Sequence, residues 1–136
     1  MKNKFEIIIP VLNEEITLAL QIKKLNTYLS SNKISTQITI ADNGSTDNTL
    51  KIIGELKKTY KNINLISVSK IGVGRAIKAA VVQSNNDLFC FMDLDFSTDL
   101  NHINEAKKLF KDKSIDCVYG SRLNSNSKVI NRKLIR

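Results

Sequence analysis

The chain has 136 residues, of which 42% are hydrophobic and 25% charged, and its formal net charge is +8. This composition fits a soluble globular domain, and the longest apolar stretches are far too short to span a bilayer. A secretory signal is not expected, since Glu6 interrupts the apolar region after Lys2 and Lys4. Most of the excess charge lies at 101–136, with nine Lys/Arg against three Asp/Glu. An electrostatic function is therefore expected there, although lysines on a solvated helix face explain part of it equally well.

Apolar runs of strand length alternate with segments of helical period, which predicts an α/β fold with a parallel sheet. The β-branched run at 5–10 indicates a buried first strand. A helix is expected from Glu14 and Glu15 onward, because its apolar residues recur every three or four positions. These residues are Leu18, Ile22, Leu25 and Leu29. A second strand at 37–41 ends in the turn-rich segment 42–49.

The second half of the chain repeats this alternation. A second helix starts near Leu50, and a short third strand covers 64–68. A third helix covers 72–83, and a fourth strand at 88–92 runs directly into Asp93. A fourth helix is expected around 103–110 and a fifth strand at 115–119, followed by a basic, polar tail. The expected order is five strands with a helix between each pair.

Polar and glycine-rich residues collect at the carboxyl ends of the expected strands, where parallel α/β sheets bind their ligands. Asp93 and Asp95 flank one residue after the fourth strand, so both carboxylates can face one site. Hard oxygen ligands of this kind bind Mg²⁺ or Mn²⁺ that is shared with phosphates and water. The pattern therefore predicts a divalent metal site, although Asp-x-Asp also occurs in ordinary surface turns.

Two further segments carry candidate binding residues. Asp42 and Asn43 close the second strand, where a side-chain oxygen can accept the ring N–H of uracil or guanine, or else cap the turn that follows. The glycine turn at 72–74 opens a helix near a possible phosphate, but it lacks the third glycine of a dinucleotide fingerprint. Lys70 and Arg75 beside it have either a phosphate-binding or a surface role.

The remaining reactive side chains do not form a known catalytic group. His102 is the only histidine and is expected at the surface, so neither a Ser-His-Asp nor a Cys-His arrangement can be assembled. Cys90 and Cys117 lie in apolar stretches without metal-ligand spacing, which predicts buried, reduced thiols in a cytosolic protein. A nucleic-acid module is disfavoured, because the aromatic residues are not interleaved with the basic ones.

Four motifs, in order, resemble those of family-2 glycosyltransferases, and most closely the polyprenol-phosphate (dolichol-phosphate) mannosyl- and glucosyltransferases. They are Ile7-Ile8-Ile9-Pro10-Val11-Leu12-Asn13-Glu14-Glu15, Ala41-Asp42-Asn43-Gly44-Ser45-Thr46-Asp47-Asn48-Thr49, Phe91-Met92-Asp93-Leu94-Asp95 and Gly120-Ser121-Arg122. The resemblance covers essentially the whole chain. It implies a Rossmann-like GT-A nucleotide-sugar-binding domain at 1–122 and the start of an acceptor-side region at 123–136.

The resemblance also implies roles for individual residues. Pro10, Leu12 and Glu14 would line the nucleoside pocket, and Asp42 and Asn43 would meet the base and ribose. The metal and the diphosphate would be held by the segment Asp93-Leu94-Asp95, with Ser97 as a further polar ligand and Lys70 on the donor side. Arg122 and Arg132 match arginines that face the acceptor phosphate. The expected place of action is cytoplasmic, at the inner face of the membrane.

The implied reaction is a single displacement, with inversion, that moves a hexose from a UDP- or GDP-sugar to a polyprenyl phosphate in cell-envelope glycan synthesis. Two departures from the family pattern bear on it. Asn43 stands where a second Asp is usual, and the chain ends at Arg136, before the further elements of family members. The alternatives are a truncated or non-catalytic nucleotide-sugar-binding module, transfer to a saccharide hydroxyl, and a nucleotidylyltransferase. The last would have a glycine-rich basic loop after the first strand, which Val11-Leu12-Asn13-Glu14 is not.

Overall fold

A computed structural model describes residues 5–121 and 123–127. The elements follow in the order β1 (Phe5–Val11), α1 (Leu18–Ser31), β2 (Gln37–Asp42), α2 (Thr49–Thr59), β3 (Ile63–Ser67), α3 (Val73–Gln83), β4 (Leu88–Phe91) and α4 (Asn101–Leu109). By internal packing the chain divides into two compact units, 1–100 and 101–136. The first unit contains the sheet with α1 to α3, and the second contains α4. The division into 1–122 and 123–136 stays a prediction.

The four strands form one sheet in the order β3-β2-β1-β4, and every neighbouring pair is parallel. The predicted α/β class is therefore confirmed. β1 is a central strand, with β2 along one edge and β4 along the other. Ile7, Ile8 and Ile9 are all fully buried. This explains why β1 has a continuous apolar run where an edge strand would alternate.

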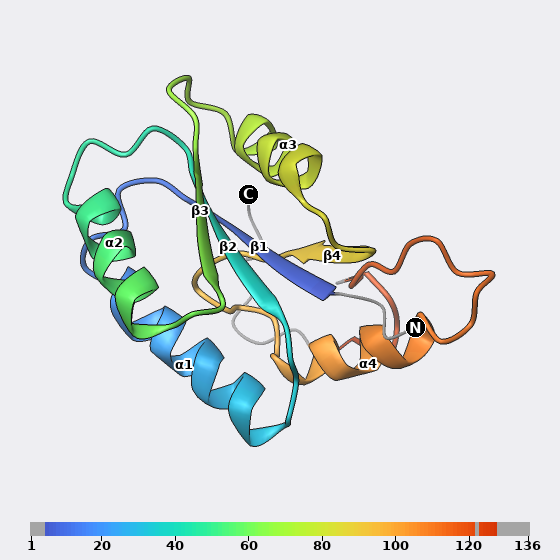
Figure 1. Cartoon of the computed structure of the whole chain (residues 1–136). Coiled ribbons are helices and arrows are strands. Elements are labelled where there is room, and N and C mark those ends of the chain that lie inside the picture. The colour runs from blue at the N-terminus through green and yellow to red at the C-terminus, as the bar shows by residue number, and fades with distance from the viewer. Residues whose placement is uncertain (1–4, 122, 128–136) are drawn as a thin grey trace. The chain divides into compact units, whose positions relative to one another are not determined.

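Helices cover both faces of the sheet in the first unit, with α1 and α2 on one face and α3 on the other (Figure 1). Small side chains let α3 approach closely: Ala76 and Ala80 pack against Ile8 of β1 and Ala41 of β2. The apolar stripe predicted for α1 is confirmed, because Leu18, Ile22, Leu25 and Leu29 are buried. α1 begins at Leu18, later than Glu14 and Glu15, and residues 15–17 form a turn that leads into it.

A buried carboxylate interrupts the apolar β1 strand on its α3 face. Glu6 is 2% exposed, and its Oε1 accepts a hydrogen bond from the Thr39 hydroxyl of β2. Its Oε2 accepts hydrogen bonds from the hydroxyl of Ser84 and, at 2.7 Å, from Nδ2 of Asn86, both in the connection from α3 to β4. These donors satisfy the carboxylate inside the fold. Glu6 therefore joins three elements at the amino end of the sheet.

Two expectations for the second half of the chain are wrong. Residues 115–119 form no strand, and half-buried Ile115 and Val118 are three positions apart, unlike the alternation of a strand. A short apolar run becomes a strand only when another strand pairs with it, and none does so here among the described residues. Cys117 is exposed where burial was expected, while Cys90 is half-buried. Neither cysteine forms a disulfide.

Among residues 5–121 and 123–127, no helix has the length and apolar character needed to cross a membrane.

Candidate functional site

The strand order places a topological switch point between β1 and β4. The chain passes from β1 to β2 and β3 on one side, and then returns to add β4 on the other side of β1. In parallel α/β sheets, ligands bind beyond the carboxyl ends of the strands at such a point. In this sheet the two flanking segments are the loop after Val11 and the segment that begins at Asp93, two residues beyond the end of β4. The candidate site is built from these segments and from the loop after β2.

The segment after β4 presents two exposed carboxylates, Asp93 and Asp95, on either side of buried Leu94. The Oδ1 atom of Asp95 accepts a hydrogen bond of 2.9 Å from the backbone N–H of Ser97. Phe96 lies between them in the left-handed region (φ 48°), so the chain turns sharply here. Leu94 anchors the turn while both acidic side chains stay open to solvent.

The donor set of this segment fits a hard divalent cation that keeps part of its coordination for phosphate and water. It offers two carboxylates, and Ser97 adds an exposed hydroxyl. Within the described residues, no group of three or more His, Cys, Asp or Glu side chains forms a metal cluster. His102 is exposed as expected, and its Nδ1 lies 2.6 Å from Glu105. A metal role for Asp93, Asp95 and Ser97 stays a prediction.

The loop after β1 is joined to the loop after β2 by side-chain hydrogen bonds, and we call this connection the loop clasp (residues 13–15 with residues 45–49). The backbone N–H of Asn13 donates to Ser45 Oγ at 2.9 Å. In return, Asn13 Oδ1 accepts from the Thr46 backbone N–H at 2.8 Å. Asn13 has φ 55°, a left-handed conformation that asparagine adopts more readily than most residues. The reciprocal bonds thus depend on one residue's backbone and side chain together.

The clasp continues through the next two residues. The N–H of Glu14 donates to Oγ1 of fully buried Thr49 at 2.8 Å, and the N–H of Glu15 donates to Asp47 Oδ2 at 3.1 Å. Both the backbone N–H and Nδ2 of Asn48 donate to Glu15 Oε2, at 2.9 and 2.8 Å. Two segments about 32 residues apart therefore form one hydrogen-bonded unit.

The hydrogen bonds that Asp47 accepts in the clasp lower the pKa of its carboxyl. Burial raises the pKa, but hydrogen bonds from the Thr49 side chain and from the backbone N–H groups of Thr49 and Glu15 together lower it below 3.8. The Thr49 N–H donates to Asp47 Oδ1 at 2.9 Å, at the first turn of α2. Asp47 therefore accepts hydrogen bonds both from the first residue of α2 and from the β1 loop.

The residues expected in the nucleoside pocket lie in the clasp or directly before it. Pro10 is half-buried at the end of β1, and Leu12 is 38% exposed in the loop that follows. Glu14 is half-buried, and its Oε2 accepts a hydrogen bond from the Thr17 hydroxyl at the start of α1. Pro10 and Leu12 thus lie at the carboxyl edge of the sheet, whereas the Glu14 side chain turns toward its own helix.

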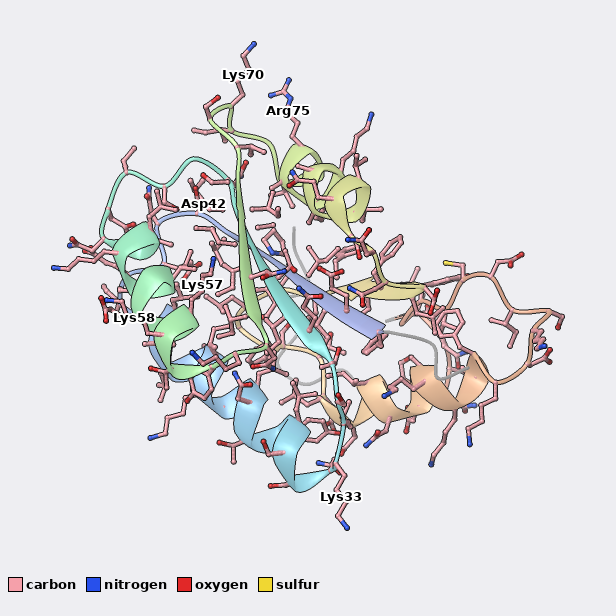
Figure 2. The ribbon with its side chains drawn as sticks, in the orientation of Figure 1. Lys33, Asp42, Lys57, Lys58, Lys70 and Arg75 are labelled. Atoms are coloured by element: carbon pink, nitrogen blue, oxygen red, sulfur yellow. The ribbon has the colours of Figure 1, made fainter. Side chains whose placement is uncertain are left out.

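Asp42 has the turn-capping role that the sequence offered as one of its two interpretations. It is fully buried, and its carboxylate accepts hydrogen bonds from the Ser67 hydroxyl at 2.8 Å and from the N–H groups of Gly44 and Ser45 at 3.3 and 3.2 Å. Figure 2 shows Asp42 at the end of β2, beneath the loop that it caps. A direct contact with a base stays a prediction.

Asn43 connects the β2 loop to the start of α3. It is 2% exposed, and its Oδ1 accepts a hydrogen bond of 2.6 Å from the backbone N–H of Gly72. Gly72 is the N-cap of α3 and has φ 155°, which an L side chain rarely adopts. The glycine turn is thus a tight entry into α3, as predicted. Lys70 and Arg75 are exposed and extend away from the sheet at this connection (Figure 2).

The two arginines expected at the acceptor phosphate, Arg122 and Arg132, lie outside the described residues. Within the clasp, sequence reasoning gave individual roles only to Glu14 and Glu15, and Asn13, Ser45 and Thr46 are the clearest omissions. The available signal was the pair of motifs itself, since Asn13 and the polar segment 45–49 each follow a buried strand. Adjacent parallel strands bring such loops together.

Comparison with known proteins agrees with this architecture. The family model described as glycosyl transferase family 2 matches residues 6–136. A dolichyl-phosphate beta-glucosyltransferase of Trichomonas vaginalis is 31% identical over 95% of this chain and 43% of its own length. A second one from that organism is 29% identical over 85% of this chain and 39% of its own length. The chain thus spans less than half of these relatives.

Solved glycosyltransferase structures share the fold. S. aureus TarS (residues 1–349) superposes with a TM-score of 0.63 at 22% identity, over 79% of this chain and 32% of that one. Glucosyl-3-phosphoglycerate synthase from Mycobacterium tuberculosis, crystallised with Mn²⁺, UDP and phosphoglyceric acid, gives a TM-score of 0.50 at 21% identity. That match covers 68% of this chain and 33% of the synthase. The fold is therefore that of the GT-A glycosyltransferases, as the sequence resemblance implied.

Proposed function

The chain belongs to glycosyl transferase family 2, and we propose that it is the donor-binding part of an inverting hexosyltransferase that uses a UDP- or GDP-sugar. The observation that carries this proposal is the position of Asp93 and Asp95, exposed beyond β4 and next to the switch point. A nucleoside diphosphate needs both a surface for its base and a countercharge for its phosphates. The loops after β1 and β2 provide the first, and the metal-binding carboxylates provide the second.

We assign the nucleoside to the surface formed by Pro10 and Leu12 beside the end of β2, where buried Asp42 and Asn43 support the loop from beneath. Pro10 and Leu12 offer apolar contact at the rim of the sheet, while Asp42 holds the loop after β2 in shape. Glu14, in the loop before α1, supports the same surface. Its backbone N–H donates to Thr49, and its carboxylate accepts from Thr17. Lys70, whose exposed side chain extends from the connection between β3 and α3, would contribute a positive charge on the donor side.

Asp93 and Asp95, with Ser97, would hold Mg²⁺ or Mn²⁺ together with the donor diphosphate, and Leu94 fixes the turn between the two carboxylates. Such a cation would act as a Lewis acid that neutralises the charge developing on the departing nucleoside diphosphate. In the proposed reaction, an acceptor oxygen would form a bond to the anomeric carbon from the side opposite the nucleoside diphosphate, as the bond to that leaving group breaks. Such a single displacement inverts the configuration.

The proposed acceptor is a polyprenyl phosphate. A phosphate monoester is largely ionised at neutral pH, because its second pKa is about 6, so it attacks without a general base. A saccharide hydroxyl would need such a base. No side chain in the described part of the site is placed for that role apart from the two carboxylates assigned to the metal. The two transferases from Trichomonas vaginalis, whose names specify dolichyl phosphate, support the same choice.

We place the acceptor phosphate at Arg122 and Arg132, which can bind a phosphate through paired N–H donors. Both belong to residues 101–136, which carry most of the chain's excess positive charge. That charge suits the cytoplasmic face of a membrane, where anionic lipid headgroups and the polyprenyl phosphate would lie. The expected result of Arg122→Ala is unchanged nucleotide binding with loss of transfer to lipid phosphate.

Calorimetry with UDP and with GDP, each with and without Mn²⁺, tests the donor site. The wild-type chain is expected to bind either UDP or GDP only when the metal is present. Asp95→Asn is expected to abolish this metal-dependent binding. Asp116→Asn is the matched control, because it removes one exposed carboxylate from the second unit. Metal-dependent binding that survives in Asp95→Asn, or its equal loss in Asp116→Asn, would refute the assignment.

A nucleotide-sugar-binding module without turnover is the alternative. Incubation with a radiolabelled UDP- or GDP-hexose separates the two functions. Release of free sugar or its transfer to a polyprenyl phosphate supports the enzyme. Binding without either product supports the module.

A further inference from the structure

The loop clasp gives Asn13 a role that neither the motif nor the family assignment supplies. We propose that Asn13 is a positioning residue, which locks the loops after β1 and β2 into one unit so that nucleotide affinity depends on it without direct contact. The nucleotide part of this inference rests on the proposed function. The coupling of the two loops rests on the hydrogen bonds alone.

Asn13 occupies the point where the two loops exchange bonds in both directions. Its backbone N–H donates to Ser45, and its side-chain oxygen accepts from the Thr46 N–H at 2.8 Å and from the Thr46 hydroxyl at 3.4 Å. An oxygen with two lone pairs can accept both bonds, and no donor or apolar side chain can replace it. The link therefore requires an oxygen at this position and a residue that tolerates φ 55°.

The neighbouring bonds depend on the same alignment. Glu14 and Glu15 donate their backbone N–H groups to Thr49 and Asp47, and Asn48 donates back to Glu15. Asn13 makes none of these three bonds, yet they connect the same two segments in the same register. If Asn13 is the fastener, loss of its side chain should loosen all of them together.

The clasp also connects the surface assigned to the nucleoside with the loop after β2. Leu12 and Glu14 are the immediate neighbours of Asn13, and the Asn43 N–H donates to the Val11 carbonyl at 2.9 Å. On its far side the β2 loop meets the β3 loop, where a Cβ on Gly44 would lie 3.4 Å from the Val68 carbonyl oxygen. The β2 loop is thus enclosed between the two connections. Movement of the β1 loop would therefore change the shape of the surface assigned to the nucleoside at Pro10 and Leu12.

Two substitutions separate the backbone requirement from the hydrogen bonds. Asn13→Gly keeps the left-handed conformation available but removes the side-chain oxygen, whereas Asn13→Asp keeps an oxygen acceptor and also tolerates this conformation. Asn85→Gly is the matched control, since Asn85 is an exposed asparagine in the connection before β4, at the opposite end of the sheet. Asn13→Asp and Asn85→Gly are expected to unfold at about the wild-type urea concentration, and Asn13→Gly at a somewhat lower one, because it loses the bonds to Thr46.

Amide hydrogen exchange of the nucleotide-free chain tests the coupling. In Asn13→Gly, the amides of Glu14, Glu15 and Asn48 are expected to exchange about tenfold faster, as for the loss of one ordinary hydrogen bond. Asn13→Asp should restore the wild-type rates, and Asn85→Gly should not change them. Faster exchange at Thr46 alone, with these three amides unchanged, would overturn the inference.

Calorimetry with UDP and Mn²⁺, and with GDP and Mn²⁺, tests the consequence for binding. Asn13→Gly is expected to raise Kd about tenfold, and Asn13→Asp to recover most of that affinity. Equal affinities of wild type and Asn13→Gly would refute the positioning role. If the wild type binds neither nucleotide, the proposed function fails, and the exchange rates still decide whether Asn13 couples the loops.

Discussion

The side-chain oxygen of Asn43 and the backbone N–H of Gly72 are 2.6 Å apart and join the end of β2 to the first residue before α3. Gly72 is the N-cap of a helix that has no side-chain cap of its own, so Asn43 performs that task from another loop. The consequence is that α3 is positioned by the same turn that follows the carboxyl end of β2.

Loss of this link should destabilise the fold. Asn43→Ala leaves the Gly72 N–H without its partner, at an expected cost of about 1–3 kcal/mol. Asn43→Asp keeps an acceptor and should lose less. Urea unfolding at pH 7 measures both, with Asn85→Ala as the control at an exposed position. Equal stability of Asn43→Ala and the control would contradict the capping role.

The buried carboxylate in β1 should be among the most sensitive positions of the sheet. Glu6→Ala removes the acceptor for Thr39, Ser84 and Asn86, and we expect a loss of at least about 2 kcal/mol in unfolding free energy. Glu6→Gln keeps one acceptor oxygen and should be intermediate. Urea denaturation provides the measurement.

The comparison is Glu55→Ala, which removes an exposed glutamate that pairs with Lys58 at 2.8 Å. This surface change should shift the unfolding midpoint far less than Glu6→Ala. A Glu6→Ala variant as stable as Glu55→Ala would show that the Glu6 hydrogen bonds contribute nothing.

Acid should weaken the loop clasp at Asp47. Because the folded pKa of Asp47 lies below 3.8, its carboxylate stabilises the fold above that pH, and the contribution is lost as pH falls through the folded pKa. The stability difference between wild type and Asp47→Asn should therefore be constant from pH 7 to 5 and shrink below pH 3.8. Urea midpoints measured across this range provide the check. A difference that stays constant down to pH 2 would contradict the assignment.

The two cysteines should differ sharply in reactivity. Burial raises the pKa of the Cys90 thiol to about 12, while Cys117 is exposed. Since the thiolate is the reactive form, a disulfide reagent at pH 8 should label Cys117 rapidly and Cys90 only after unfolding in urea. Cys117→Ser should abolish the rapid phase. Rapid labelling that persists in this variant would show that Cys90 is accessible.

The elements with a local pattern could be predicted from the sequence. The run Ile7–Ile9 predicted a buried first strand, and the spacing of Leu18, Ile22 and Leu25 predicted the buried face of α1. Both patterns can be recognised locally, because apolar residues recur within one short segment at the spacing of a buried strand or of a helix face. The segment 115–119 shows the limit, because a strand exists only where another strand pairs with it.

The sequence could predict which polar residues lie at the candidate site, but not which hydrogen bonds join its loops. Asp93, Asp95 and Asp42 were singled out as polar residues at strand ends, and the structure places them there. The reciprocal bonds of Asn13 could not be read from the sequence, because its partners lie 32 and 33 residues away. No local rule assigns a partner at that distance. The same holds for Glu6, whose partners lie 33 to 80 residues along the chain.

The strand order has a consequence for the chain during its synthesis. The ladder β3-β2-β1 is complete once Ser67 has emerged, but the other edge of β1 pairs only when β4 follows at Leu88–Phe91. Until then, one edge of the most apolar strand has unpaired N–H and C=O groups, which invite pairing with other chains. A nascent chain stalled between these two points should be the form most prone to aggregate, and a chaperone would be needed most during that interval.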